Sequence, residues 1–258
     1  MSHRFFTRFN LQSSANHFPA TATIGAALQN TSPSEIQGYL DEFEAIQAAR
    51  ADRMRALFGD RLAPLRGKKV VFFGDSITSD NLGYRATVSR AAHLQAVDGS
   101  ISGGTSATVL QYAKERIQQE KPDLVSIMLG ANDSVGIGTE DLGQVSLEEY
   151  GRNLRAIVSW SLESGARVLL FAVTPIHEAR FAKQFTAQGK VQSNENIQRY
   201  NQRLRIIAEE LGLSLFDHGY LTDPETLLEK DGIHLSPQGQ EQMAAHWLAC
   251  AIDLLKSI

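Results

Sequence analysis

Short, strongly apolar runs recur along the chain from Lys68 onward, each followed by a more polar stretch. The runs are rich in Val, Ile, Leu and Phe and are too short for buried helices, which is typical of strands covered on both faces. We therefore expect strands at residues 70–74, 94–97, 124–129, 167–173 and 213–216.

The segments between these runs have apolar residues at intervals of three and four, which predicts amphipathic helices. We expect helices over residues 106–119, 147–163 and 197–211, and a C-terminal helix after Pro237. Gly165 and Gly212 are placed to end the second and third helices. Strands that alternate with helices indicate an α/β fold, with a mostly parallel five-stranded sheet and helices on both faces.

A further helix is predicted ahead of the first strand. Residues 32–35 read Ser-Pro-Ser-Glu, a capping box with proline at the first helical position, and Gly59 is a plausible stop. One face of this helix is apolar, through Ile36, Leu40, Phe43, Ile46 and Leu57. We interpret that face as packing against the body of the domain. A dimer contact and a cover over an active site stay open.

Residues 1–34 contain Arg4 and Arg8 but no acidic residue. Ala20-Thr21-Ala22 resembles a signal-peptidase site, but the stretch before it is too polar for the apolar core of a signal peptide. We expect a flexible tail, and an organellar targeting segment stays open. An extension over residues 1–66 thus precedes one α/β domain over residues 67–258.

Composition and charge exclude several classes of protein for this chain. The chain of 258 residues is 43% hydrophobic, and 25 basic against 29 acidic residues give a net charge of −4. Without a basic run, nucleic acid is not an expected partner, and no apolar stretch is long enough for membrane insertion. The single Cys250 excludes an internal disulfide and a multi-cysteine metal site. It favours a reducing compartment, so we expect a cytoplasmic protein.

The candidate catalytic residues lie in loops at one edge of the predicted sheet. Right-handed crossovers place the loops after parallel strands at one edge of the sheet, where ligands bind. The first strand runs into Gly74-Asp75-Ser76-Ile77, so Ser76 lies at a strand-to-helix turn. Free N–H groups at a helix start favour developing negative charge, which suits a nucleophile. Taken alone, such a serine is more often a helix cap.

The next two loops offer hydrogen-bond donors at the same edge. Residues 98–105 read Asp-Gly-Ser-Ile-Ser-Gly-Gly-Thr, and glycines there allow a close approach of backbone N–H groups to a ligand. Asn132, after the third strand, adds a side-chain amide. Turn formation and helix capping are the alternatives. Neither a dinucleotide fingerprint nor a phosphate-binding loop is present, so nucleotide binding is not expected.

The loop before the C-terminal helix carries Asp231 three residues ahead of His234. At this spacing the carboxylate can orient the imidazole and leave its other nitrogen to accept a proton from serine. A solvent-facing pair is the alternative. The histidines lack the helical spacing of zinc ligands, so no metal is expected.

The four blocks, in this order, closely resemble the motifs of the SGNH (GDSL) hydrolase family over about residues 68–256. The resemblance implies that Ser76 is the nucleophile, His234 the base and Asp231 its orienting acid. It also implies that Ser76, Gly103 and Asn132 supply the oxyanion hole. Asp75 is expected to be structural.

The family resemblance further implies a flavodoxin-like three-layer α/β/α sandwich and a serine esterase that needs no cofactor. Loops 134–146 and 174–194 flank the active edge and are mostly polar, with His177 and Arg180 as candidate substrate contacts or simple surface residues. We therefore expect a small, fairly polar ester with a short acyl or O-acetyl group. An acyltransferase, a non-catalytic binding module and a homo-oligomer formed through the N-terminal helix stay open.

Overall fold

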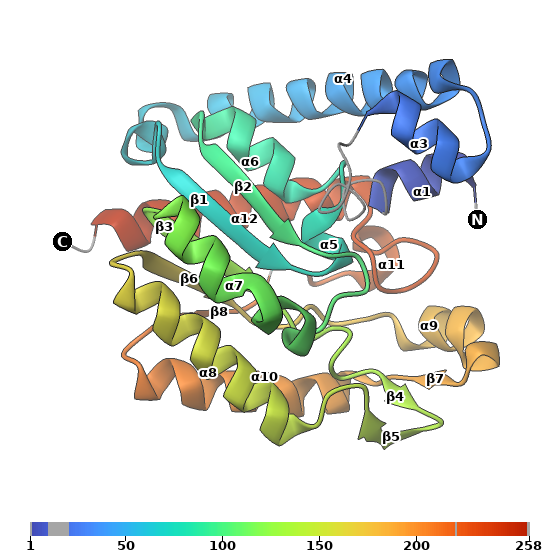
Figure 1. Ribbon diagram of the computed structural model, residues 1–258, viewed down its shortest axis with the longest axis vertical. Coiled ribbons are helices and arrows are strands. Elements are labelled where there is room, and N and C mark those ends of the chain that lie inside the picture. Colours follow the sequence, from blue (N-terminus) through green and yellow to red (C-terminus); the bar gives the residue numbers. More distant parts are fainter. Residues whose placement is uncertain (1, 10–20, 220, 257–258) are drawn as a thin grey trace.

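The computed structural model describes residues 2–9, 21–219 and 221–256, and its centre is a five-stranded parallel sheet (Figure 1). The strand order is β2-β1-β3-β6-β8. The expected fold class is confirmed, with small shifts of the strand ends. The strands are β1 (Lys69–Gly74), β2 (Gln95–Ser100), β3 (Leu124–Met128), β6 (Arg167–Phe171) and β8 (Leu215–Phe216).

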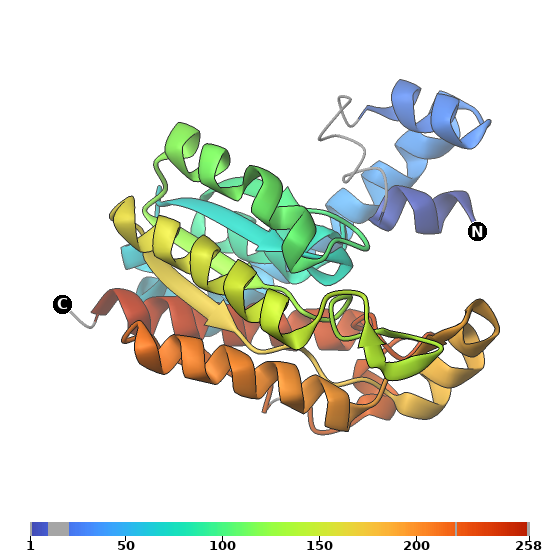
Figure 2. The same cartoon turned by 60° about the horizontal axis from the view of Figure 1, so that its bottom comes forward.

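Helices cover both faces of the sheet and form the outer layers of a three-layer sandwich (Figures 1 and 2). One face packs against α6 (Tyr84–Ala92) and α12 (Pro237–Lys256), and α4 (Pro33–Phe58) packs on the outside of α6. The other packs against α7 (Ser106–Glu120), α8 (Leu147–Glu163) and α10 (Asn194–Glu210). Val70 and Phe72 of β1 point to the first face, and Val71 and Phe73 to the second, because side chains alternate along a strand.

Helix ends follow the expected signals. Gly165 and Gly212 follow α8 and α10 with φ of 86° and 66°, the left-handed conformation that glycine adopts without strain. Ser32 caps α4 by accepting a hydrogen bond from the Glu35 N–H at 3.2 Å. The reciprocal half of the predicted capping box is absent. The Glu35 carboxylate instead accepts from Tyr39 at 2.9 Å and pairs with His3.

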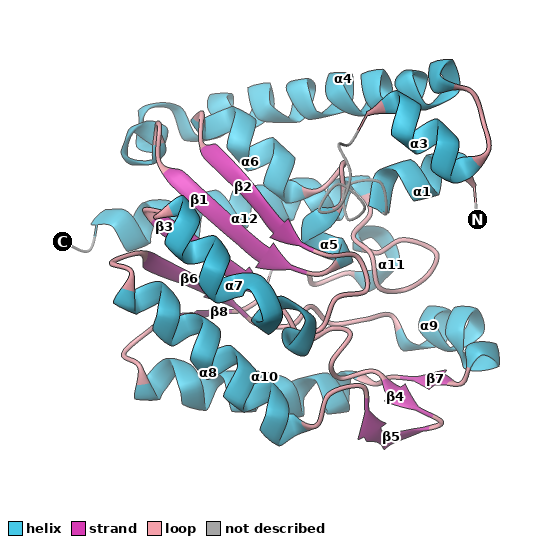
Figure 3. Ribbon diagram, in the orientation of Figure 1, coloured by secondary structure: helices cyan, strands magenta, loops and turns pink. Residues whose placement is uncertain are grey.

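Both loops expected at the active edge contain regular structure (Figure 3). Three strands, β4 (Gly136–Ile137), β5 (Thr139–Gly143) and β7 (Lys190–Val191), form a small antiparallel sheet. Between β6 and β7 lie α9 (Glu178–Phe185) and a 3-10 turn (Thr186–Gln188). Strands this short leave no periodic pattern, and β4 pairs with β7 across more than fifty residues.

The expected flexible tail is wrong for the described part of the N-terminal segment, most of which is helical. Two helices occupy it, α1 (His3–Phe9) and α3 (Ala22–Gln29), while residues 10–20 lie outside the described part of the chain. Long-range contacts stabilise α1: Arg8 pairs with Asp80 and Glu229. A sequence pattern of seven residues carries no sign of partners so far along the chain.

The remaining short helices connect the main layers. They are a 3-10 helix (Gly59–Leu65) after α4, α5 (Ser76–Ser79) after β1, and α11 (Pro224–Leu227) ahead of α12. In the described part of the chain, no helix combines the length and apolar content needed to cross a bilayer.

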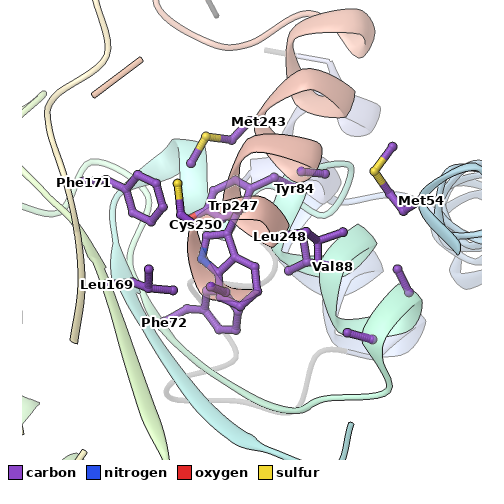
Figure 4. Close-up of a cluster of buried hydrophobic side chains, with 14 of the residues drawn as sticks. Met54, Phe72, Tyr84, Val88, Leu169, Phe171, Met243, Trp247, Leu248 and Cys250 are labelled. Atoms are coloured by element: carbon purple, nitrogen blue, oxygen red, sulfur yellow. The ribbon is translucent and has the colours of Figure 1, made fainter. Parts of the chain in front are cut away.

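Trp247 lies at the centre of the larger core cluster (Figure 4). It is fully buried, its ring lies 5.4 Å from that of Phe72, and its Nε1–H donates to the Ser126 hydroxyl at 2.9 Å. Met54 of α4 belongs to the same cluster. The predicted packing of the 32–58 helix against the domain is therefore confirmed, while self-association through this helix stays a prediction.

Trp247→Ala should lower the free energy of unfolding by about 3–5 kcal/mol, because it leaves a large cavity and an unpaired Ser126 hydroxyl. Leu57→Ala is the matched control, since Leu57 is 63% exposed on α4 and should change stability by about 0.5 kcal/mol or less. Urea unfolding followed by circular dichroism measures both. Equal effects of the two substitutions would contradict this account of the core.

Candidate active site

The carboxyl ends of the strands meet at one cavity of about 680 Å³. Ser76 reaches it from the end of β1, Gly103 from the loop after β2, Asn132 from the loop after β3, and Asp231 and His234 from the loop before α12. All five residues line this cavity, although more than 150 positions separate the first from the last. The parallel topology brings them together because it collects these loops at one edge.

Ser76, His234 and Asp231 form a continuous hydrogen-bonded chain. Ser76 Oγ lies 2.8 Å from His234 Nε2, and His234 Nδ1 lies 2.6 Å from Asp231 Oδ2. Asp231 Oδ1 also accepts from the backbone N–H groups of Ile233 and His234, at 2.9 and 3.0 Å. These contacts fix the carboxylate and the imidazole relative to each other and leave one ring nitrogen facing the serine hydroxyl.

The environment of Asp231 favours its ionised form. Burial acts to raise the pKa of this carboxyl, but the hydrogen bond and charge of His234, together with two backbone N–H donors, lower the pKa below its ordinary value. Asp231 is therefore charged at neutral pH and holds a proton on His234 Nδ1. That tautomer leaves the Nε2 lone pair for the Ser76 proton.

The turn that presents Ser76 is tightly built. A Cβ on Gly74 would lie 2.2 Å from Thr78 Oγ1, so only glycine fits beside α5. The Asp75 carboxylate caps α5 by accepting from the Ile77 N–H at 3.0 Å, which agrees with its expected structural role. Burial raises the pKa of Asp75 to about 6. The close packing at Gly74 and the cap from Asp75 together fix the turn in which Ser76 lies.

The expected oxyanion donors come from two loops that bind each other. Asn132 Nδ2 donates to the Gly104 carbonyl at 3.1 Å, which leaves its second proton for a ligand. The Gly104 N–H is engaged with the Ile101 carbonyl at 2.8 Å, whereas Gly103, with φ of 74°, lines the cavity. Of the two glycines, this geometry favours Gly103 as the backbone donor.

Asp133 anchors the Asn132 loop and was missed by the sequence analysis. Both of its carboxylate oxygens accept from the Ser106 N–H at 3.0 Å, and the Ser106 hydroxyl also donates to it. Asn153 donates in turn to Ser106 Oγ at 3.1 Å. Burial raises the pKa of Asp133 to about 6. An acidic residue in a loop gives no sign, in sequence alone, that it will bind the first turn of α7.

His177 and Arg180, the expected substrate contacts, lie away from the cavity lining. His177 Nε2 lies 2.6 Å from a Glu225 carboxylate oxygen, and the other oxygen of Glu225 pairs with Arg180. Arg180 also donates to the backbone carbonyls of Glu225 and Leu228, at 3.1 and 3.2 Å. Both side chains join α9 to α11, so the geometry favours a structural role for them.

Apolar side chains from distant segments form much of the cavity wall. Phe5 and Phe9 come from α1, and Phe181 and Phe185 from α9. The Phe9 ring centroid is 4.3 Å from that of His234. Phe5 and Phe9 were not candidates from sequence, whereas Phe181 and Phe185 lie in the 174–194 loop that was expected to flank the active edge. Within the described residues, no cluster of His, Cys, Asp and Glu is suited to hold a metal ion.

Comparison with known proteins shows which family the chain belongs to. Residues 72–242 match the model of the GDSL-like lipase/acylhydrolase family, and the chain belongs to that family. It is a carboxylic ester hydrolase. The predicted family resemblance is confirmed.

Relatives and solved structures place the chain within the family. An isoamyl acetate-hydrolyzing esterase 1 homolog from Bos taurus is 28% identical over 71% of this chain and 81% of its own length. An arylesterase from Vibrio mimicus is 25% identical over 69% of this chain and 84% of its own. The fold resembles the crystal structure of TesA, with a TM-score of 0.57, 23% identity, and coverage of 72% and 99% of the two chains.

The raised pKa of Asp133 predicts a specific pH dependence of stability. Between the unfolded pKa of about 3.9 and the folded value of about 6, the folded state holds a proton that the unfolded state has released. The contribution of Asp133 therefore becomes less favourable as pH rises through this range. Relative to Asp133→Asn, which cannot ionise, the wild type should lose about 2 kcal/mol between pH 4 and pH 7.

Urea unfolding of both proteins at intervals from pH 4 to pH 7 measures this difference. Only its change with pH matters, since the amide also alters the hydrogen bonds to Ser106. A difference that stays constant over the range, or grows in the opposite direction, would contradict a buried Asp133 carboxyl with a raised pKa.

Proposed function

We propose that the chain is a serine esterase that hydrolyses a small ester through a Ser76-His234-Asp231 triad and an acyl-enzyme. The observation that carries this proposal is the unbroken chain of contacts from Ser76 Oγ through His234 to Asp231, at 2.8 and 2.6 Å. A serine hydroxyl is a weak nucleophile unless a base can take its proton, and this geometry provides the base.

The reaction begins with attack of Ser76 Oγ on the ester carbonyl while His234 Nε2 takes the hydroxyl proton. A tetrahedral adduct forms, and its negative oxygen accepts from the Ser76 and Gly103 N–H groups and from the Asn132 amide. Asp231 remains ionised and stabilises the imidazolium. As the adduct collapses, His234 returns the proton to the alcohol oxygen, and the alcohol leaves.

Water completes the cycle in the second half of the reaction. His234 takes a proton from a water molecule that attacks the acyl-enzyme carbonyl, and the same donors hold the second oxyanion. Collapse of this adduct breaks the bond to Ser76 Oγ, which recovers its proton from His234. The products are a carboxylic acid and the free enzyme, so the cycle uses no cofactor.

We propose a short acyl group, such as acetyl, on a small ester that binds in a cavity with both polar and apolar walls. The printed names of two relatives, an isoamyl acetate-hydrolyzing esterase homolog and an arylesterase, support a small-molecule ester. Gln184, Gln188 and Gln192 line the cavity and supply polar contacts. The cytoplasmic location expected from the sequence stays a prediction.

Hydrolysis of p-nitrophenyl acetate and butyrate by the wild type and by Ser76→Ala tests the proposal. We expect serine-dependent turnover, faster with acetate. Acceptor alcohols added to the assay distinguish hydrolysis from acyl transfer. Absence of Ser76-dependent turnover across a wide ester panel would refute the esterase proposal, and product found mainly as a new ester would indicate a transferase.

Asn132→Ala should lower kcat by about two to three orders of magnitude, because one oxyanion donor contributes roughly 3–4 kcal/mol to transition-state binding. Asn132→Asp is the matched variant, since it keeps the size of the side chain but replaces the donor with an acceptor. It should be at least as impaired. A thermal melt checks that both variants remain folded. Near-normal turnover in the aspartate variant would exclude Asn132 as a donor.

A further inference from the structure

Helix α1 contributes to the cavity although it lies outside the family match, which begins at residue 72. Arg4, Phe5, Arg8 and Phe9 line the same cavity as Ser76 and His234. In Figure 1, α1 lies beside α4 and near α5 and α11, at the end of the sheet where the strands point. An N-terminal segment thus forms one wall of the proposed active site.

The wall is aromatic and faces His234. The Phe9 ring centroid is 4.3 Å from the imidazole with an interplanar angle of 39°, and the Phe5 ring approaches it edge-on at 6.4 Å. The two phenylalanines contact each other at 4.8 Å. Phe9 is only 2% exposed, whereas Phe5 is half-buried and so has surface left for a ligand.

Buried contacts fix the position of α1. Arg8 binds both oxygens of the Asp80 carboxylate at 2.8 and 2.7 Å, and a third nitrogen binds Glu229 at 2.9 Å. Asn81 donates from its backbone to the Arg8 carbonyl at 2.9 Å and from its side chain to the Thr7 carbonyl at 2.8 Å. These partners lie in the loop after Ser76 and in the loop before His234. Helix α1 is therefore bound both to the segment that carries Ser76 and to the segment that carries His234.

The cations of α1 are already neutralised by protein groups. Arg4 pairs with Glu42 at 2.7 Å, and Arg8 has two carboxylate partners. This face of the cavity therefore offers a ring surface to a ligand and has little unpaired charge to attract an anion. An apolar group fits it better than a carboxylate or a phosphate does.

The chemistry of the proposed reaction assigns this wall to one half of the substrate. His234 Nε2 must lie within hydrogen-bond reach of the alcohol oxygen in order to protonate it. The groups around the imidazole therefore contact the alcohol part of the ester, while the oxyanion donors lie on the other side of the carbonyl. Phe5 and Phe9 are the α1 side chains whose rings lie nearest His234.

We infer that α1 forms the alcohol-binding wall, that Phe5 determines specificity, and that the enzyme prefers esters whose alcohol carries an aromatic or branched apolar group. The inference rests on the proposed esterase function. Phe9 acts as a positioning residue, because it packs on the imidazole and is too buried to offer much surface to substrate.

Acetate esters test the inference with the acyl group held constant. The ratio of kcat/KM for benzyl acetate to kcat/KM for ethyl acetate is measured for the wild type, Phe5→Ala, Phe5→Leu and Phe6→Ala. Phe6 is the matched control, because it lies on the same helix but packs against Ala26 and Ile36, away from the cavity. Thermal melts check that all four proteins are folded.

We expect Phe5→Ala to lower the benzyl-to-ethyl ratio about tenfold, because the lost ring surface costs more binding for the larger alcohol than for the smaller one. Phe5→Leu should retain most of the ratio, and Phe6→Ala should leave it unchanged. An unchanged ratio in Phe5→Ala would overturn the inference. So would an equal loss on both esters, which would indicate damage to the site as a whole.

Binding of benzyl alcohol to the Ser76→Ala protein, followed by NMR, separates the wall from turnover. Weaker binding of benzyl alcohol to the Ser76→Ala, Phe5→Ala double variant than to Ser76→Ala alone supports the alcohol-binding wall. Equal binding to the two proteins contradicts it. Wild type that lacks Ser76-dependent hydrolysis of either ester would refute the esterase proposal, whereas turnover without discrimination between the two alcohols would refute the inference alone.

Discussion

The contact of His234 with Ser76 on one side and with Asp231 on the other is the interaction on which the proposed reaction depends. A hydroxyl, an imidazole and a carboxylate have ordinary properties when separate. In line, at 2.8 and 2.6 Å, they form a relay in which a proton can leave the serine. The rest of the fold can be understood by how it places these three groups.

The parallel sheet positions most of the loops that carry the site residues. Its inner strands β1, β3 and β6 are buried on both faces, and loops from β1, β2 and β3 meet the loop before α12 at one edge. Buried carboxyls then fix individual loops: Asp75 caps the turn that bears Ser76, and Asp133 binds the loop of Asn132 to α7. Burial raises the pKa of each to about 6, so their positions come at a cost in stability at neutral pH.

The elements that could be predicted from sequence are those specified by local patterns. The five strands, the long helices and the glycine stops depend on residues within each segment. The four motif blocks place Ser76, Gly103 and Asn132 after strands and the Asp231–His234 pair just before the C-terminal helix. The small antiparallel sheet and α1 depend on contacts across dozens of residues, such as Arg8 with Asp80. His177 and Arg180 show the same limit, because Glu225 binds both and no local feature indicates that partner.

The most direct test of the central claim is the rate at which a fluorophosphonate labels Ser76, with the site of labelling read by peptide mass spectrometry. Wild type should react at Ser76, and folded His234→Ala should react at least about a hundredfold more slowly, because the hydroxyl has lost its base. Equal rates in the two proteins, or a label on a different serine, would contradict the account.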